Sequence, residues 1–237
     1  MKVAIHQPHY FPWLGYLDKM AKADKFILMD EVQLTDKSNM FRNKFLTHDG
    51  KEKFLTVCFT KKGYMDVPFT DVTLNKNINW QVKHINFIRD SYKKTPYFNE
   101  IWERIEPIFL KEFDYLCDVD VATVLLLRDM FAIDTDIIYQ HDLKYDKSLK
   151  KNELVLQLCK CVGADKYLSG NGARKYMDVD YFHHNGVEVE FQSFVYPSYT
   201  QLNTEEFVPN LSGLDVLFNC GIDGARKIFW DNVNNNK

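Results

Sequence analysis

The sequence predicts an α/β fold: a parallel-containing sheet opened by a βαβ unit, with a β-hairpin and an inserted helical layer. Three observations predict it. Two buried strand-like runs flank a short helical pattern near the start of the chain, a turn signal then joins two further strand-like runs, and a long middle stretch has helical periodicity. At 237 residues, one domain can hold all of these elements, and we expect a single α/β domain over residues 1–237.

The βαβ unit opens the chain. Residues 2–6, KVAIH, are a short apolar run typical of a buried strand, and residues 25–32, KFILMDEV, are a second. Between them, residues 13–23 place apolar side chains at helical spacing, with Pro12 just before the first turn. Because a helical crossover joins the two strands, we expect them to be parallel.

A hairpin and a helical layer follow. Residues 38–59 contain two strand-like runs around HDGK, and Asp49-Gly50 is a typical hairpin turn. Residues 78–131 contain three segments with apolar side chains at helical spacing, with a break at Pro96 and a kink expected at Pro107. We therefore expect a mainly helical insertion over residues 78–131.

The second half of the chain returns to alternating strands and helices. Strand-like patterns occupy residues 134–140, 166–170 and 187–194, and residues 151–164 form a helical pattern that stops near Gly163. Residues 211–233 predict two short helices around Cys220-Gly221, with Ser212 as an N-cap.

The composition excludes several classes of function. The net charge of −3 argues against a nucleic-acid partner, because nonspecific binding draws on a dense basic surface. No apolar run approaches the roughly 18 residues of a membrane span, and the N-terminus lacks a signal-peptide pattern, so we expect no membrane insertion. The cysteines are scattered and are expected to be free thiols in a cytoplasmic protein: Cys58, Cys117, Cys159, Cys161 and Cys220. No set of residues has metal-ligand spacing, and the sequence does not indicate an oligomeric state.

The segment IHQPHYFPWLGY carries the strongest functional signal. In parallel sheets, ligands bind beyond the carboxyl ends of strands, near the start of the following helix. His6, Gln7 and His9 are expected at this edge, with Tyr10 and Trp13 beside them. The helix N-terminus would attract an anion, and the imidazoles of His6 and His9 are candidate catalytic groups that stabilise a phosphate or transfer protons. Alternatively, the histidines only cap the strand and helix ends.

This arrangement is reminiscent of nucleotidyl-transferring enzymes that carry a histidine-rich loop between their first strand and first helix. Such histidines stabilise a leaving pyrophosphate or a transferring phosphoryl group. Here aromatic residues replace the histidine that those enzymes carry one turn into the helix.

Two further segments are expected at the same site. Asp30 ends the second strand, where its carboxylate can take up a proton or help to hold Mg²⁺, and Gln33 follows it. Arg42 on the hairpin is suited to a phosphate or a carboxylate, with Asn43 beside it, although a solvated strand face is the alternative.

The remaining candidates lie in the second half. YLSGNGARKYMD ends a strand in small residues whose N–H groups can approach a ligand, although its spacing is not that of a Walker loop. FQSFVYPSYTQL is rich in aromatic residues that suit a sugar or a nucleobase, or equally a loop packed on the core. The substrate-binding candidates in these segments are Ser169, Gly170, Asn171, Arg174, Tyr196, Tyr199 and Gln201.

These same segments resemble the WbqC-like protein family nearly end to end. The opening HQP-x-Y-x-P-W-x-G-Y is specific to that family, and RNKF, YLSGNGARKYMD, FQSFVYPSYTQ and LSGLDVLFNCG add to the similarity. Family members are typically found among bacterial surface-polysaccharide (O-antigen) biosynthesis functions. The resemblance therefore implies a cytoplasmic role in making or decorating an activated sugar, without a settled mechanism.

The residues and the resemblance together lead to one hypothesis and two rivals. The hypothesis is N-acyl or aminoacyl (for instance glycyl) transfer onto a nucleotide-linked amino sugar, with ATP and Mg²⁺ activating the carboxylate of a small acyl or amino-acid donor. His6 and His9 would stabilise phosphate charge, and Asp30 would bind metal or accept a proton from the amine. One rival is a sugar-nucleotide transferase, isomerase or nucleotidyl-transferring enzyme that does not use ATP in this way. The other is a non-catalytic partner in polysaccharide assembly.

Overall fold

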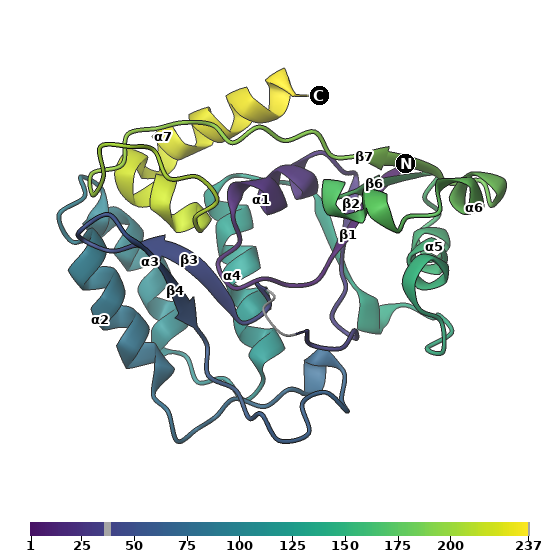
Figure 1. The fold of residues 1–237 in the computed structure, drawn as a ribbon, viewed down its shortest axis with the longest axis horizontal. Coiled ribbons are helices and arrows are strands. Elements are labelled where there is room, and N and C mark those ends of the chain that lie inside the picture. Colours follow the sequence, from purple (N-terminus) through teal and green to yellow (C-terminus); the bar gives the residue numbers. More distant parts are fainter. Residues whose placement is uncertain (36–38, 237) are drawn as a thin grey trace.

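Parallel strands form the main sheet of the molecule, in the spatial order β5-β2-β1-β6-β7 (Figure 1). The computed structural model describes residues 1–35 and 39–236. The strands are β1 (Lys2–His6), β2 (Lys25–Leu28), β5 (Asp136–Tyr139), β6 (Lys166–Ser169) and β7 (Glu188–Phe191). The chain therefore builds outward from β1 to one edge and then returns to start the other half beside β1, which is the order of doubly wound α/β folds. The predicted α/β class is confirmed.

Each face of the sheet packs against its own layer of helices. Val3, Ile5 and Ile27 belong to one core cluster, with side chains of α5 (Lys151–Cys161) and α6 (Val179–His184). Ala4 and Phe26 point to the opposite face and belong to a larger cluster with α1 (Leu14–Ala21) and the other helices. The alternation follows from the two-residue period of a strand, and it explains why residues 3–5 of β1 and 26–28 of β2 are all apolar.

The larger core joins the sheet to the helices and hairpin at the left of Figure 1. The hairpin pairs β3 (Arg42–Leu46) with β4 (Glu52–Thr56), and Gly50 in its turn has φ +78°, as the predicted Asp-Gly turn requires. Ser38, the first residue of the predicted hairpin segment, lies outside the described residues. The helices are α2 (Trp80–Tyr92), α3 (Phe98–Leu110), α4 (Leu116–Met130) and α7 (Gly213–Asn235), and short 3₁₀ turns cover Phe69–Asp71, Gln140–Asp142 and Asn171–Lys175.

The end of the second strand differs from the prediction. The second strand ends at Leu28 instead of residue 32, because the side chains of Asp30 and Glu31 bond to residues after β5. The prediction of two helices around Cys220-Gly221 is confirmed, because α7 consists of two helical stretches that meet at a kink at Gly221, where φ is +72°. The N-cap prediction at Ser212 is confirmed, since its hydroxyl accepts a hydrogen bond from the N–H of Leu214.

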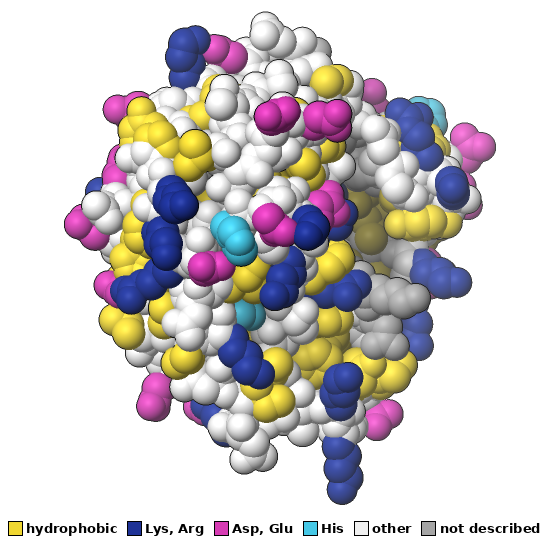
Figure 2. All heavy atoms as spheres, turned by 60° about the vertical axis from the view of Figure 1, so that its left-hand side comes forward, with side chains coloured by type: hydrophobic (Ala, Val, Ile, Leu, Met, Phe, Trp, Pro, Cys, Tyr) yellow, Lys and Arg dark blue, Asp and Glu magenta, His cyan; other side chains and the backbone are white. Residues whose placement is uncertain are grey.

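The face drawn in Figure 2 carries both signs of charge, with Lys and Arg side chains interspersed among Asp and Glu. In the part of the chain that the structure describes, no helix is long and apolar enough to cross a membrane.

Candidate active site

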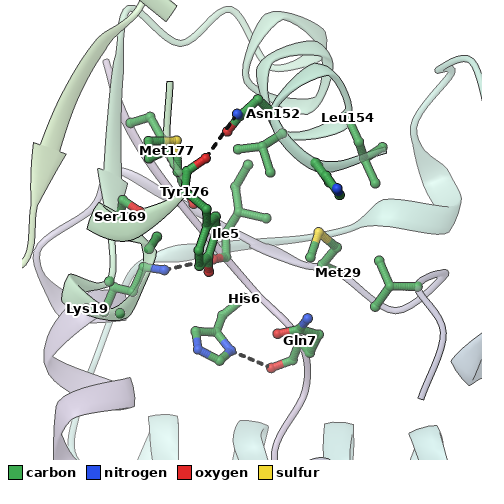
Figure 3. Close-up of a pocket in the computed structure, with 17 residues that line it drawn as sticks. Ile5, His6, Gln7, Lys19, Met29, Asn152, Leu154, Ser169, Tyr176 and Met177 are labelled. Carbon is green, nitrogen blue, oxygen red and sulfur yellow. Dashed lines mark hydrogen bonds between the residues drawn. The ribbon is translucent and has the colours of Figure 1, made fainter. Parts of the chain in front are cut away.

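A cavity of about 580 Å³ opens where the strand order reverses, between the carboxyl ends of β1 and β6. This is the position at which doubly wound sheets bind ligands, and the volume lies within the range of small-molecule sites. Figure 3 shows the side chains that surround the cavity. Its wall includes Ile5, His6, Gln7, Lys19, Met29, Val32, Lys151, Asn152, Leu154, Val155, Tyr167, Ser169, Gly170, Gly172, Ala173, Tyr176 and Met177.

Most of this wall is apolar, and its polar groups are few. Leu154 and Val155 come from the first turns of α5, while Tyr176 and Met177 follow the 3₁₀ turn after β6. Tyr176 is 70% exposed, and its backbone carbonyl accepts a hydrogen bond from the Asn152 amide at 3.3 Å. Apolar walls with a few convergent polar groups are typical of sites for nucleotides and other small molecules.

Lys19 is the strongest chemical feature of the cavity. The residue is 3% exposed, and Nζ donates a hydrogen bond to the carbonyl of Ile5 at 2.8 Å. Within residues 1–35 and 39–236, no carboxylate lies within ion-pair distance of Nζ. Burial lowers the pKa of Lys19 to about 7, since the charged form has lost its hydration without gaining a counter-ion.

The position of Lys19 follows from its helix. Helical side chains lean toward the helix N-terminus, so a residue in the second turn of α1 reaches back to the end of the preceding strand. In Figure 3, Lys19 points toward Ile5, with His6 on one side and Ser169 on the other. The ammonium therefore lies directly at the switch point.

Two histidines lie near Lys19. The rings of His6 and His9 pack edge to face with centroids 4.6 Å apart, and Nδ1 of His9 is buried without a hydrogen-bond partner among the described residues. Burial, together with the neighbouring His9 and Lys19, lowers the pKa of His6 well below its usual value, and burial with the charge of Lys19 lowers the pKa of His9 to about 3. Burial disfavours the charged form of all three groups in the free protein.

Hydrogen bonds to the hairpin and to α4 hold the loop before α1 in place. Asn43 on the hairpin donates its amide to the carbonyls of Tyr10 and Phe11, and the N–H of Phe11 bonds to the Thr123 hydroxyl of α4 at 2.9 Å. These bonds fix Phe11 at φ +38°, a conformation that is costly for a residue with a side chain. Asn43 thus positions the loop and does not line the cavity.

The expected anion site at the helix N-terminus is not what the structure presents. Residues 8–18 contribute nothing to the cavity wall, and the start of α1 is buried instead against Ser212 and Gly213. Gly15 leaves the space that the Trp13 ring fills, and that ring stacks on Tyr196. The group of α1 that faces the cavity is therefore the side chain of Lys19, and not the helix N-terminus that was expected to attract the anion.

The structure divides the other predicted residues into several groups. Ser169 and Gly170 line the cavity, whereas Arg174 stacks over Phe191 at 4.2 Å and bonds to Asn171 just outside it. Arg42 lies over the Phe54 ring at 4.4 Å on the hairpin, and Gln33 donates to the carbonyl of Met65.

The aromatic loop forms a separate buried cluster. Asp215 of α7 is fully buried and accepts hydrogen bonds from Tyr92, Tyr199 and Gln201. Tyr196 donates to the carbonyl of Leu211, and Tyr10 bonds to His84. The structure therefore does not bring Tyr10, Trp13, Tyr196, Tyr199 and Gln201 to the cavity wall.

Asp30 lies at the same edge of the sheet in a pairing that the sequence analysis missed. Both of its carboxylate oxygens bond to His141, one to the ring Nδ1 at 2.5 Å and the other to the backbone N–H at 3.2 Å. With Asp30 only 1% exposed, these bonds leave it poorly placed to hold Mg²⁺. Among the described residues, no group of three or more His, Cys, Asp and Glu side chains could hold a metal ion.

Two signals could have found the missed residues. Lys19 is a cation inside a short helix that joins two mainly apolar strands, where little of the helix surface can remain in water. His141 comes directly after the strand-like residues 134–140, at the edge where Asp30 was already expected.

Comparisons with known proteins agree with the similarity seen in the sequence. The profile of the WbqC-like protein family matches residues 7–227. A protein of Mycobacterium tuberculosis (strain ATCC 25618 / H37Rv), described as "Uncharacterized protein Rv1507c", is 31% identical over 224 residues, which cover 94% of this chain and 95% of that protein. No solved structure gives a significant match. Since the family match spans nearly the whole chain, the protein belongs to the WbqC-like protein family.

Proposed function

We propose that this protein is a group-transfer enzyme that binds a nucleotide-linked amino sugar at the switch-point cavity and forms an amide on its amine. The acyl or aminoacyl donor, for instance glycine, is activated through ATP and Mg²⁺. The observation that carries the proposal is Lys19, a buried ammonium that lines the cavity and has no carboxylate partner among the described residues.

The electrostatics support an anionic ligand. Holding an unpaired ammonium in a buried site costs free energy, and a phosphate would supply both the opposite charge and the missing hydrogen-bond acceptors. His6 lines the same cavity next to Lys19, so a phosphate bound there would favour the protonated forms of both groups. The ring of His9 packs edge to face against that of His6.

The shape supports a nucleotide as the carrier of that phosphate. The apolar wall formed by Ile5, Val155 and Met177 suits a base and a ribose, and the exposed ring of Tyr176 at the rim can stack on a base. In this arrangement the phosphates lie toward Lys19, at the end of β1, and the sugar extends toward the carboxyl ends of the neighbouring strands.

The family context supports an amino sugar as the acceptor. The resemblance associates WbqC-like proteins with surface-polysaccharide functions, and nucleotide-linked amino sugars are acylated on nitrogen in such pathways. In the proposed reaction, ATP converts the donor carboxylate into an acyl phosphate or an acyl adenylate. The sugar amine then attacks the acyl carbon, the C–N bond forms, and phosphate or AMP leaves.

The test mixes the purified protein with ATP, Mg²⁺, glycine and a panel of UDP- and dTDP-linked 4-amino sugars. The expected product is a nucleotide sugar that is heavier by one glycyl group, with one ADP or AMP released per amide, as measured by mass spectrometry. In parallel, calorimetry measures UDP and dTDP affinity for the wild type, Lys19→Met and Lys25→Met. Lys25 is the matched control, because it starts β2 at the opposite edge of the sheet.

We expect Lys19→Met to weaken nucleotide affinity by roughly 10- to 100-fold, the usual value of a charge-assisted hydrogen bond to a phosphate. Lys25→Met should leave the affinity unchanged. Nucleotide binding that is equal in all three proteins would remove the basis of the proposal.

Nucleotidyl transfer onto a sugar phosphate is the second candidate, and the pairing of His6 with His9 directly after the first strand favours it. It would release pyrophosphate from a nucleoside triphosphate and sugar phosphate without forming an amide. Nucleotide binding with neither product would point to a non-catalytic role in polysaccharide assembly.

A further inference from the structure

The carboxyl ends of β2 and β5 carry a second polar cluster beside the cavity. Asp30 follows β2 by two residues, and His141 follows β5 by two residues. The carboxylate of Asp30 accepts the ring Nδ1–H of His141 at 2.5 Å and its backbone N–H at 3.2 Å. The two hydrogen bonds that this buried carboxylate accepts therefore fix both the backbone and the ring of His141.

Neighbouring groups hold the pair in place. The Glu31 carboxylate accepts a hydrogen bond from the Tyr145 hydroxyl at 2.7 Å and forms an ion pair with Lys147. The backbone N–H of Glu31 donates a hydrogen bond to the side-chain oxygen of Gln140. The same Gln140 donates to Tyr145 at 2.8 Å, which closes the network. Residues 140–147 are thus tied to the end of β2, and the imidazole of His141 has a fixed position on it.

This geometry leaves one ring nitrogen of His141 available. Because Asp30 holds Nδ1–H, the other nitrogen, Nε2, carries the free lone pair. The His141 side chain is 46% exposed, and Asp142 is the nearest carboxylate to Nε2, at 3.6 Å, which is too long for a hydrogen bond. A carboxylate that orients an imidazole with an accessible Nε2 is the arrangement of a general base.

The pair lies within reach of a ligand in the cavity. His6, Leu28 and Tyr139 are in register on three neighbouring strands. With strands about 4.8 Å apart, the end of β5 lies roughly 10 Å from the end of β1. Met29 and Val32, which flank the segment that contains Asp30, line the cavity. A sugar attached to a phosphate at Lys19 would extend across these strand ends.

We propose that Asp30 and His141 form the acid–base dyad of the site, in which His141 is the catalytic base and Asp30 is its positioning residue. This inference rests on the proposed function. As the sugar amine attacks the acyl carbon and the C–N bond forms, Nε2 of His141 takes the proton that the amine loses. The leaving phosphate or AMP departs with the electron pair of the broken C–O bond, and the imidazolium then returns its proton to water.

The dyad has a defined pH dependence. Desolvation opposes the charged form of His141, but the hydrogen bond and the charge of Asp30, with smaller contributions from Asp142 and Glu31, outweigh it and raise the pKa of the imidazole. Tyr139 also faces the ring, with centroids 5.3 Å apart. A base must be unprotonated to act, so kcat/KM should fall as pH drops through this raised pKa.

The experiment compares the wild type with His141→Gln, Asp30→Asn and His48→Gln in the glycyl-transfer assay. We expect His141→Gln to lower kcat roughly 100- to 10,000-fold while KM for the nucleotide sugar stays within about threefold, since general-base catalysis has this magnitude. Asp30→Asn should lower kcat as well and move the acidic limb of the pH profile to lower pH. His48→Gln, which breaks a surface pair with Asp90, should change nothing.

The outcomes separate this inference from the proposed function. Turnover by the wild type with full kcat in His141→Gln would overturn the dyad alone. If no acceptor in the panel turns over, the proposed function fails, and nitrogen NMR of the His141 ring then decides the dyad. A ring with its proton on Nδ1 whose signals shift when UDP is added would support an acid–base residue at the site. Signals that do not respond to bound UDP would overturn it.

Discussion

At the scale of single residues, the molecule places a cation where the physical chemistry of folding disfavours it. Lys19 is 3% exposed, and among the described residues the carbonyl of Ile5 is its only hydrogen-bond partner. Such a group destabilises the free protein, and a ligand that supplies a negative charge recovers part of that cost. Functional residues are often retained although they lower the stability of the protein, and Lys19, which is suited to binding an anion, fits this pattern.

Replacing Lys19 by Met should therefore stabilise the protein while it weakens ligand binding. We expect the free energy of unfolding at pH 7 to rise by about 1–3 kcal/mol, because a buried ammonium is exchanged for an apolar side chain of similar length. Urea unfolding measures this change, with Lys25→Met as the control. A destabilised Lys19→Met protein would mean that the ammonium has a structural partner.

The same residue predicts how ligand affinity changes with pH. Burial lowers the pKa of Lys19 to about 7, so the side chain loses its charge as pH rises above 7. Since an anion binds to the ammonium, UDP binding should take up close to one proton at pH 8, and its affinity should fall by up to about tenfold per pH unit above 7. Calorimetry in buffers of different ionisation enthalpy counts the proton. Affinity that is constant from pH 7 to 9 would contradict an ionised Lys19 in the complex.

At the scale of elements, His84 connects three parts of the fold. It lies on α2, its Nδ1 accepts the Tyr10 hydroxyl at 2.8 Å, and its Nε2–H donates to the carbonyl of Thr56 on β4 at 3.1 Å. These bonds need the neutral ring, and burial lowers the pKa of His84 to about 4. The loop before α1, the hairpin and α2 are thus held together by one uncharged imidazole.

This bridge should make the protein sensitive to acid. The folded-state pKa is below the unfolded value of about 6.5, so the unfolded chain binds the extra proton first, and stability falls as pH drops from 6.5 toward 4. We expect this group to account for up to about 3 kcal/mol of the loss. Urea unfolding of the wild type and of His84→Gln between pH 7 and 4.5 measures it. Equal losses in both proteins would assign the acid sensitivity elsewhere.

The bend of α7 depends on a single glycine. Gly221 has φ +72°, and a Cβ atom at this position would lie 2.7 Å from the ring of Tyr97. Gly221→Ala should destabilise the protein by about 2–4 kcal/mol, the sum of a left-handed backbone cost and a packing clash. Gly224→Ala, in the same helix at ordinary helical φ, should stay within about 1 kcal/mol. Thermal unfolding compares the two, and similar midpoints would exclude the clash.

At the scale of the whole molecule, much of the fold followed from local sequence patterns. The βαβ unit, the hairpin and the helices α2 to α4 each carry a hydrophobic period within one segment, and such periods report secondary structure directly. The order of the strands could not be predicted in this way, because the sequence of residues 166–169 does not indicate that β6 pairs with β1. The break between the two helical stretches of α7 was predictable, since Cys220-Gly221 interrupts the helical pattern where Gly221 has a positive φ.

The site was only partly predictable for the same reason. His6 and Ser169 end their strands, and Gln7 and Gly170 come directly after them, so their place at the carboxyl edge could be inferred. Lys19 and His141 reach this edge only through the packing of α1 on the sheet and the pairing of β5 with β2. The aromatic loop was expected at the ligand because its residues suit sugars, whereas the fully buried Asp215 draws Tyr199 and Gln201 into the core.

The decisive measurement is a crystal structure of the protein with a UDP-linked 4-amino sugar bound. Phosphate oxygens within hydrogen-bond distance of Lys19 Nζ, with the base against the Tyr176 side of the cavity and the amine toward His141, would be the predicted result. A nucleotide bound elsewhere, with the cavity between β1 and β6 unchanged and Lys19 still bonded only to Ile5, would contradict the assignment of the site.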